Sequence, residues 1–327
     1  MKSIKKIVWI LIAASLSSSM YSCLDDEGIN PAPPSSATGP NDIAAIANTD
    51  SRTDSMAVAL NEANLMPIFQ SANTYTLFAP NNQAFIDLLA TDSTWNRIAD
   101  IDAITLTNLL YYHTLGSEVK STDLTDSSYA TTLNTEGTPK RENTVIEVDL
   151  TFGAKLNNSV KVEAFNIQAT NGVVHIIDQV MRPQNVLELA NHDERFSSLV
   201  NAMRIFGDTI TKEINGNGPY TVFAPTNEAF QRLLDSDTTW NSLSDIPRAT
   251  LNAVLSYHIV NGVNIQNNEF TQNQTLTTLD NGTLTVNITS SAQLLTTDTM
   301  QGAVNITLTD IQGTNGVIHT VEEVLIP

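Results

Sequence analysis

The chain has very little cysteine, histidine and positive charge. Its 327 residues include one cysteine, five histidines and 16 basic residues against 35 acidic ones, which gives a formal net charge of −19. A single cysteine excludes an intramolecular disulfide. The shortage of basic residues argues against nucleic acid as a partner, because phosphate binding needs a basic face. Charged residues make up only 16% and hydrophobic residues 41%, which favours folded domains over disorder.

Familiar catalytic and cofactor-binding patterns are also absent from the sequence. It contains no GxSxG elbow, no glycine-rich phosphate loop and no CxxC pair. No histidine has a second histidine or cysteine at metal-ligand spacing. The acidic stretches ATDSTW and DSDTTW lack the alternating oxygen ligands and the closing glutamate of a calcium loop. The sequence therefore predicts a protein that is not an enzyme and that needs no cofactor or metal.

The first 23 residues predict a processing signal. Three lysines precede the apolar run IVWILIAASL at 7–16, which has the length of a signal peptide and is short for a membrane span. The stretch SSSMYSC then ends at Cys23 and resembles a bacterial lipoprotein signal, in which the cysteine carries the lipid, including palmitate. The alternative is an ordinary secretory signal with an incidental cysteine. We expect residues 1–22 to be removed, which leaves 13 basic and 35 acidic residues and a net charge of −22.

The segment after the cysteine predicts a flexible tether and export of the protein to the cell surface. Residues 23–41 are rich in proline, serine and glycine and show no hydrophobic period, so they should form a flexible tether. They begin with an acidic patch, LDDEG at 24–28, that resembles the surface-export signal of Bacteroidetes lipoproteins. The alternative is a few solvated charges at the start of a linker. We expect a lipid-anchored protein of the outer membrane, exposed at the cell surface, with its lipid as the membrane contact.

An internal repeat organises the rest of the chain. YTLFAPNNQAF at 75–85 returns as YTVFAPTNEAF at 220–230, and TNGVVH at 170–175 returns as TNGVIH at 314–319. A separation near 145 residues indicates duplicated domains, not a solenoid of short repeats. We assign the first domain to 42–183 and the second to 184–327.

Each copy predicts a mixture of helices and strands. YTLF and YTVF are short apolar runs typical of buried strands, and the following Ala-Pro ends each strand. Asn81 and Thr226 can cap the helices that follow. The stretches ITLTNLLYYHTL and ATLNAVLSYHIV predict a second helix in each copy, and the later halves are strand-like. Asn281-Gly282 favours a tight hairpin turn in the second copy.

These phrases together resemble the fasciclin domain family. Its first signature block matches the two copies of the opening phrase, and its second matches NGVVHIIDQVM and NGVIHTVEEVL. The resemblance implies an α+β fold with two tandem fasciclin-like domains, each a β-sandwich or wedge with several packed helices. It also implies a non-enzymatic adhesion protein that binds an extracellular protein or glycan whose identity the sequence does not specify.

The resemblance supplies a set of candidate binding residues. In some animal members the Tyr-His region and an Asp-Ile pair contact integrins, which bacteria lack. The matching residues here are Tyr112, His113, Tyr257, His258, Asp310 and Ile311. The first copy breaks the Asp-Ile pattern with Asn166-Ile167. The alternative is structural, with tyrosines packed in the core.

The histidines also favour a structural interpretation. Strand alternation places His175 and His319 on apolar faces, where a half-buried ring would satisfy a backbone carbonyl or hydroxyl. His192 has no partner in the other copy and is predicted to be exposed.

Two functions remain open from the sequence. The first is adhesion by a surface lipoprotein. The second is glycan binding as an accessory protein of a polysaccharide-uptake system. Only three tryptophans are present, one of them in the signal segment, so stacking on sugars would have to use tyrosine or phenylalanine.

Overall fold

The computed structural model describes residues 41–135, 138, 143–150, 153–206 and 208–327. The predicted signal peptide, Cys23 and all but the last residue of the predicted tether lie outside the described residues. The two sequence repeats are the first repeat (42–183) and the second repeat (184–327).

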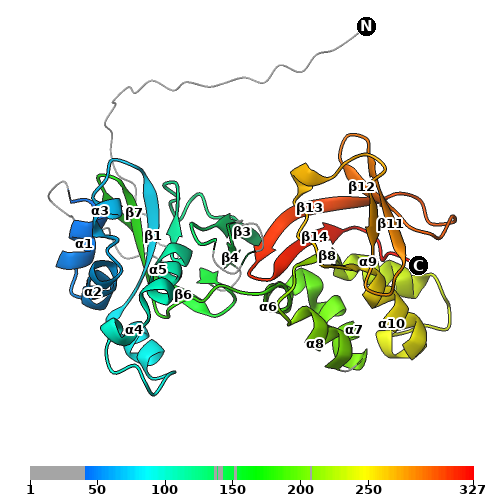
Figure 1. Cartoon of the computed structure of the whole chain (residues 1–327), viewed down its shortest axis with the longest axis horizontal. Coiled ribbons are helices and arrows are strands. Elements are labelled where there is room, and N and C mark those ends of the chain that lie inside the picture. The colour runs from blue at the N-terminus through cyan, green and yellow to red at the C-terminus, as the bar shows by residue number, and fades with distance from the viewer. Residues whose placement is uncertain (1–40, 136–137, 139–142, 151–152, 207) are drawn as a thin grey trace, which may run out of the picture. The chain divides into compact units, whose positions relative to one another are not determined.

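Each repeat begins with helices and ends with strands, as predicted (Figure 1). The first repeat contains α1 (Ile43–Thr49), α2 (Asp54–Glu62), α3 (Met66–Phe69), β1 (Tyr75–Pro80), α4 (Asn82–Leu89), η1 (Ile98–Asp100), α5 (Ala103–Tyr112), β2 (Thr114–Leu115), β3 (Ser128–Thr131), β4 (Val145–Asp149), β5 (Lys155–Leu156), β6 (Val160–Ala169) and β7 (Gly172–Ile177). The second contains α6 (Val186–His192), η2 (Glu194–Phe196), α7 (Ser197–Phe206), α8 (Asp208–Ile214), β8 (Tyr220–Pro225), α9 (Asn227–Asp235), η3 (Leu243–Asp245), α10 (Arg248–Tyr257), β9 (Ile259–Asn261), η4 (Asn267–Glu269), β10 (Thr275–Thr277), β11 (Thr283–Ile288), β12 (Ala292–Leu295), β13 (Val304–Gly313) and β14 (Gly316–Val321).

The strands of each repeat form one mixed sheet with the same topology in both. The orders are β2-β1-β7-β6-β5-β4-β3 and β10-β11-β12-β13-β14-β8-β9, each with seven strands. Among the strand pairs of the described residues, only β1–β7 and β8–β14 are parallel. The long strands β6 and β13 each carry two register irregularities, and such bulges bend a strand. This confirms the predicted α+β class.

The two signature blocks of each repeat lie side by side as the parallel pair. In the first repeat the register runs from Tyr75 opposite Gly172 to Pro80 opposite Ile177. Gly172 has a positive φ of 137°, and a Cβ there would lie 1.8 Å from the carbonyl oxygen of Tyr75. Gly316 meets Tyr220 in the same way in the second repeat. The second block therefore needs its glycine because only a bare backbone fits against the first block.

The central strands are buried on both faces. Leu77 and Ala79 of β1 join the core that also contains residues of α1, α2 and α5. Phe78 points to the other face and packs with Ile146 of β4 and Val160 of β6. The bent sheet thus encloses a core of its own, separate from the core under the helices, and the second repeat divides its core in the same way.

The helix after each proline begins where the sequence predicts. The Asn81 side chain accepts a hydrogen bond from the Ala84 N–H at 2.8 Å, and Thr226 accepts one from Ala229 at 3.3 Å. These side chains satisfy N–H groups that the first helical turn leaves unpaired. The predicted hairpin forms between β10 and β11, and Asn281 adopts a φ of 64° in its connection.

Candidate ligand-binding site

The two Tyr-His pairs lie at the ends of equivalent helices, with both tyrosines fully buried. The Tyr112 hydroxyl donates to the carbonyl oxygen of Val145 at 2.9 Å. It accepts a hydrogen bond from the Asn157 amide at 3.0 Å. The Tyr257 hydroxyl donates to the Thr283 carbonyl at 2.5 Å. Both tyrosines therefore tie a helix end to the strands that close the bent sheet.

The histidines of these pairs are neutral braces between backbone groups. His113 Nδ1 donates to the Leu109 carbonyl at 2.7 Å, while its Nε2 accepts from the Met181 N–H at 2.9 Å. His258 repeats this arrangement with Val254 and Leu325. A backbone N–H aimed at Nε2 requires an unprotonated nitrogen there, which fixes the tautomer. Burial lowers the pKa of both rings to about 4.

A second pair of histidines stacks on the phenylalanines of the signature strands. His175 lies 5.3 Å from Phe78 between ring centroids, and His319 lies 5.8 Å from Phe223. Their Nε2 atoms lie 2.9 and 2.8 Å from carbonyl oxygens. The predicted satisfaction of a backbone carbonyl is confirmed, but both rings are fully buried instead of half-buried. His192 is partly buried and lies 2.7 Å from the Gln184 amide, so the prediction of an exposed ring is wrong.

The Asp-Ile pair of the second repeat lies at a bulge of β13. Asp310 has a φ of 63°, and its Oδ1 accepts a hydrogen bond from the Asn267 N–H at 2.7 Å. Its own N–H donates to His319 Nδ1 at 3.3 Å. Ile311 is buried, whereas the Asp310 side chain is 39% exposed.

The Asp-Ile bulge has a counterpart in the first repeat. Asn166 has a φ of 56° and accepts a hydrogen bond from the Ser121 N–H at 2.8 Å. Asparagine and aspartate both tolerate this left-handed backbone, so the Asn–Asp difference leaves the bulge unchanged. Among the six candidate binding residues, only Asp310 presents a side chain that a partner can reach.

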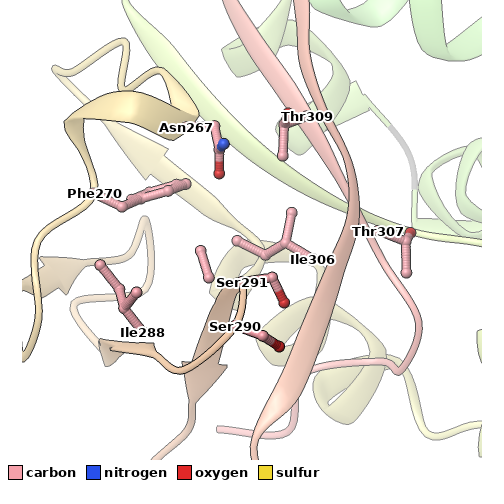
Figure 2. A pocket seen from close by; sticks show the side chains of 9 residues that line it. Asn267, Phe270, Ile288, Ser290, Ser291, Ile306, Thr307 and Thr309 are labelled. Atoms are coloured by element: carbon pink, nitrogen blue, oxygen red, sulfur yellow. The ribbon is translucent and has the colours of Figure 1, made fainter. Parts of the chain in front are cut away.

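The second repeat contains a cavity of ≈ 400 Å³ that the sequence did not indicate (Figure 2). It lies between η4, the turn from β11 to β12, and β13. Its floor is apolar and buried, formed by Phe270, Ala292 and Ile306. Its rim is formed by Asn267, Ile288, Ser290, Ser291, Thr307 and Thr309. In Figure 2 the side chains of Asn267, Phe270 and Ile288 face those of Ile306 and Thr309 across the opening. Its volume falls within the range of about 300–1,000 Å³ typical of small-molecule sites.

One difference between the repeats accounts for part of this cavity. The 144-residue offset of the second block aligns Thr309 with Phe165. In the first repeat Phe165 covers its histidine, with 5.8 Å between the ring centroids of Phe165 and His175. In the second repeat the covering ring is Phe270, supplied by the segment after η4, at 5.3 Å from His319. The position of β13 that aligns with Phe165 therefore holds the smaller Thr309, which lies at the cavity rim. Aligning the two copies position by position would have found this difference.

Two absences concern the part of the chain that the structure describes. There, no three or more His, Cys, Asp or Glu side chains gather in a way that would hold a metal ion. No helix of that part combines the length and the apolar character needed to cross a bilayer.

The comparison with family models decides the family. The model described as Fasciclin domain matches residues 51–183 and again 194–327. The chain belongs to the fasciclin domain family. The sequence resemblance and the tandem arrangement are therefore confirmed.

Several curated fasciclin relatives are similar to this chain. Transforming growth factor-beta-induced protein ig-h3 of Sus scrofa is 29% identical over 266 residues, which cover 80% of this chain and 36% of that protein. Human periostin is 27% identical over 264 residues, covering 79% and 29%. Protein sll1483 of Synechocystis is 30% identical over 146 residues, covering 43% and 73%. The chain thus spans about a third of the length of these two animal relatives.

A solved structure also resembles the chain. It is a FAS1 domain pair from the insect cell adhesion molecule fasciclin I, at 16% identity and a TM-score of 0.48. The match covers 85% of this chain and 95% of the solved one.

Proposed function

We propose that this protein is a lipid-anchored, cell-surface binding protein whose two fasciclin domains attach the cell to an extracellular partner. The observation that carries the proposal is the presence of two fasciclin domains behind a lipoprotein-type signal ending at Cys23. The signal supplies a membrane anchor, and the predicted tether lets the domains reach beyond the lipid headgroups. The domains supply the binding surface.

The chemistry of the chain supports binding over catalysis. The four histidines of the matched pairs are all buried, and each ring contacts backbone groups through both of its nitrogens. None of these rings is therefore placed to exchange protons with a substrate. The acidic net charge disfavours polyanionic partners and leaves neutral or basic surfaces as the natural targets.

The anchor and the exposure of the domains have separate tests. Cys23→Ala should move the protein from the membrane fraction to the soluble fraction, because the thiol that carries the lipid is lost. Ser22→Ala keeps the cysteine and is the matched control. Membrane association that survives Cys23→Ala would contradict the anchor.

Exposure is tested by treating intact cells with protease. Release of fragments from the fasciclin domains is expected while a periplasmic marker stays intact. Protection of the domains until the outer membrane is opened would contradict surface exposure, and it would leave the anchor unaffected.

Glycan binding within a polysaccharide-uptake system is the second candidate function. The cavity of the second repeat favours it, because the rim contains hydroxyl and amide groups and the floor is apolar. Neighbouring genes for glycosidases and transporters, together with loss of growth on one polysaccharide in a deletion strain, would favour uptake over adhesion.

A further inference from the structure

The cavity of the second repeat has polar rim groups that are free to bind a ligand. The described residues provide no hydrogen-bond partner for the side chains of Asn267, Ser290, Ser291 and Thr309. Each hydroxyl offers one donor and two acceptor sites, and the amide offers two of each. Thr307 differs, because its hydroxyl donates to the Thr320 carbonyl at 3.3 Å. Figure 2 shows it on the far side of β13 from the other rim residues.

Nearby amide side chains outside the cavity are already paired with one another. The Asn287 amide donates to Gln293 at 3.0 Å, and the Gln293 amide donates to Asn305 at 2.7 Å. The Gln272 amide donates to Asn287 at 3.0 Å. These amide side chains thus satisfy one another, whereas the Asn267 amide at the cavity rim takes no part in their network.

The charges of the cavity restrict what it can hold. Among the residues that the structure describes, its lining contains no Asp, Glu, Lys, Arg or His. A phosphate, sulfate or carboxylate would find no cationic side chain there. The exposed carboxylate of Asp310 adjoins the rim residue Thr309 and repels anions further. A metal cation would find no carboxylate in the lining itself. The ligand should therefore be uncharged.

The distribution of polar and apolar groups restricts the ligand further. A purely apolar ligand would leave the rim hydroxyls without partners and cost free energy. A sugar ring carries hydroxyls around its edge and apolar C–H groups on its face. These groups match the rim and the floor, where Phe270 and Ile306 are buried.

We infer that this cavity binds one unit of an uncharged saccharide. The inference rests on the proposed binding function and is independent of the lipid anchor. The first repeat has Phe165 where the second has Thr309, so the site is assigned to the second repeat. The two domains of the protein then differ in role even though they share a fold.

The test uses the mature chain with Cys23→Ala and a panel of oligosaccharides. Neutral glucan, mannan, galactan and xylan oligomers are titrated by calorimetry, with oligogalacturonate and a heparin oligomer as anionic probes. Saturable binding of at least one neutral oligomer is expected, without binding of the anionic ones. Thr309→Phe, which places the first repeat's residue at the rim, should weaken that binding at least tenfold. A double variant, Ser290→Ala with Ser291→Ala, should weaken it without filling the cavity.

Controls separate loss of the site from loss of the fold. Thr299→Ala removes a hydroxyl from an exposed position of the same repeat outside the cavity and should leave binding unchanged. Circular dichroism and the unfolding midpoint show whether each variant is folded. Binding that survives both cavity variants, a preference for the anionic oligomers, or no neutral oligomer bound would each overturn the inference. Surface exposure and attachment to a protein partner would still stand in those cases, because they are measured on intact cells.

Discussion

At the scale of the residue, the signature side chains act as connectors between backbone segments. His113 joins the end of α5 to Met181, and Tyr112 joins it to Val145. A buried polar group that loses its partner costs about 1–3 kcal/mol, so removal of a connector should lower the free energy of unfolding by about that amount. The motif residues that identify the family therefore maintain the fold. The proposed contact with a partner would therefore use exposed positions such as those at the cavity rim.

Burial of the neutral histidines makes a prediction about pH. The pKa of His113 and His258 is lowered from 6.5 to about 4. Their contribution to the free energy of unfolding is present above pH 6.5, where the unfolded chain is also neutral. It is lost as the pH falls towards 4, at about 1.4 kcal/mol per unit of pKa difference for each ring. NMR titration should place the ring midpoints near 4, and a midpoint near 6.5 would contradict the burial argument.

The buried carboxyl of Glu147 has the opposite effect on the pH dependence of the free energy of unfolding, so a variant without it is the control. Burial raises the pKa of its carboxyl to about 8, and its Oε2 has no hydrogen-bond partner among the described residues. A raised carboxyl pKa removes stability as the pH rises from about 4.5 to 8. Denaturant unfolding of Glu147→Gln should therefore be compared with that of the natural chain. The free energy of unfolding is expected to fall more steeply between pH 6.5 and 4.5 in the variant.

At the scale of the element, local sequence signals are reliable where the neighbouring residues decide the structure. The caps at Asn81 and Thr226 and the helices after the prolines form as predicted, and β10 and β11 form the predicted hairpin without the predicted tight turn. The turn is longer than a two-residue turn, because β10 ends at Thr277 and β11 begins at Thr283. Its geometry depends on Tyr257, which is distant in sequence. That dependence was invisible to the sequence pattern.

Gly282→Ala tests how tightly the hairpin packs on Tyr257. A Cβ at this position would lie 2.5 Å from Cε2 of the buried tyrosine ring, which has no room to move. Overpacking of this kind costs about 1–3 kcal/mol, and we expect the free energy of unfolding of the second repeat to fall by about that amount. Gly302→Ala is the matched control, since nothing lies within 4 Å of a Cβ there. Equal effects of the two substitutions in chemical denaturation would contradict the packing.

At the scale of the whole molecule, the same brace appears once in each repeat. Asn171 accepts a hydrogen bond from the Ile43 N–H and donates to the carbonyls of Phe69 and Ser71. Asn315 does the same with Val186, Ile214 and Gly216. Each asparagine thus connects the N-terminal helices of its repeat to the hairpin of the second signature block. The sequence showed the asparagine in TNGV twice but gave no sign of these partners.

Substituting the braces one at a time tests whether each repeat is stabilised separately. Asn171→Ala should weaken hydrogen-exchange protection within 42–183, and Asn315→Ala within 184–327. Each change removes the partner of two buried backbone groups and of one partly buried group, at a cost of about 1–3 kcal/mol for each buried group. Asn268→Ala, at an exposed position of η4, is the control. Loss of protection throughout both repeats from either substitution would show that the repeats are stabilised as one unit.

The sequence by itself determined the α+β class, the tandem repeat, the family and the positions of the capped helices. These follow from hydrophobic period, turn residues and a duplicated phrase, which are all readable along the chain. Only the tertiary structure decided that five of the six candidate binding residues are buried and that a cavity lies beside β13. Burial and cavities depend on which distant segments meet. Phe270, Thr309 and the pair Ile288 and Ser291 come from three separate segments, and no local pattern joins them.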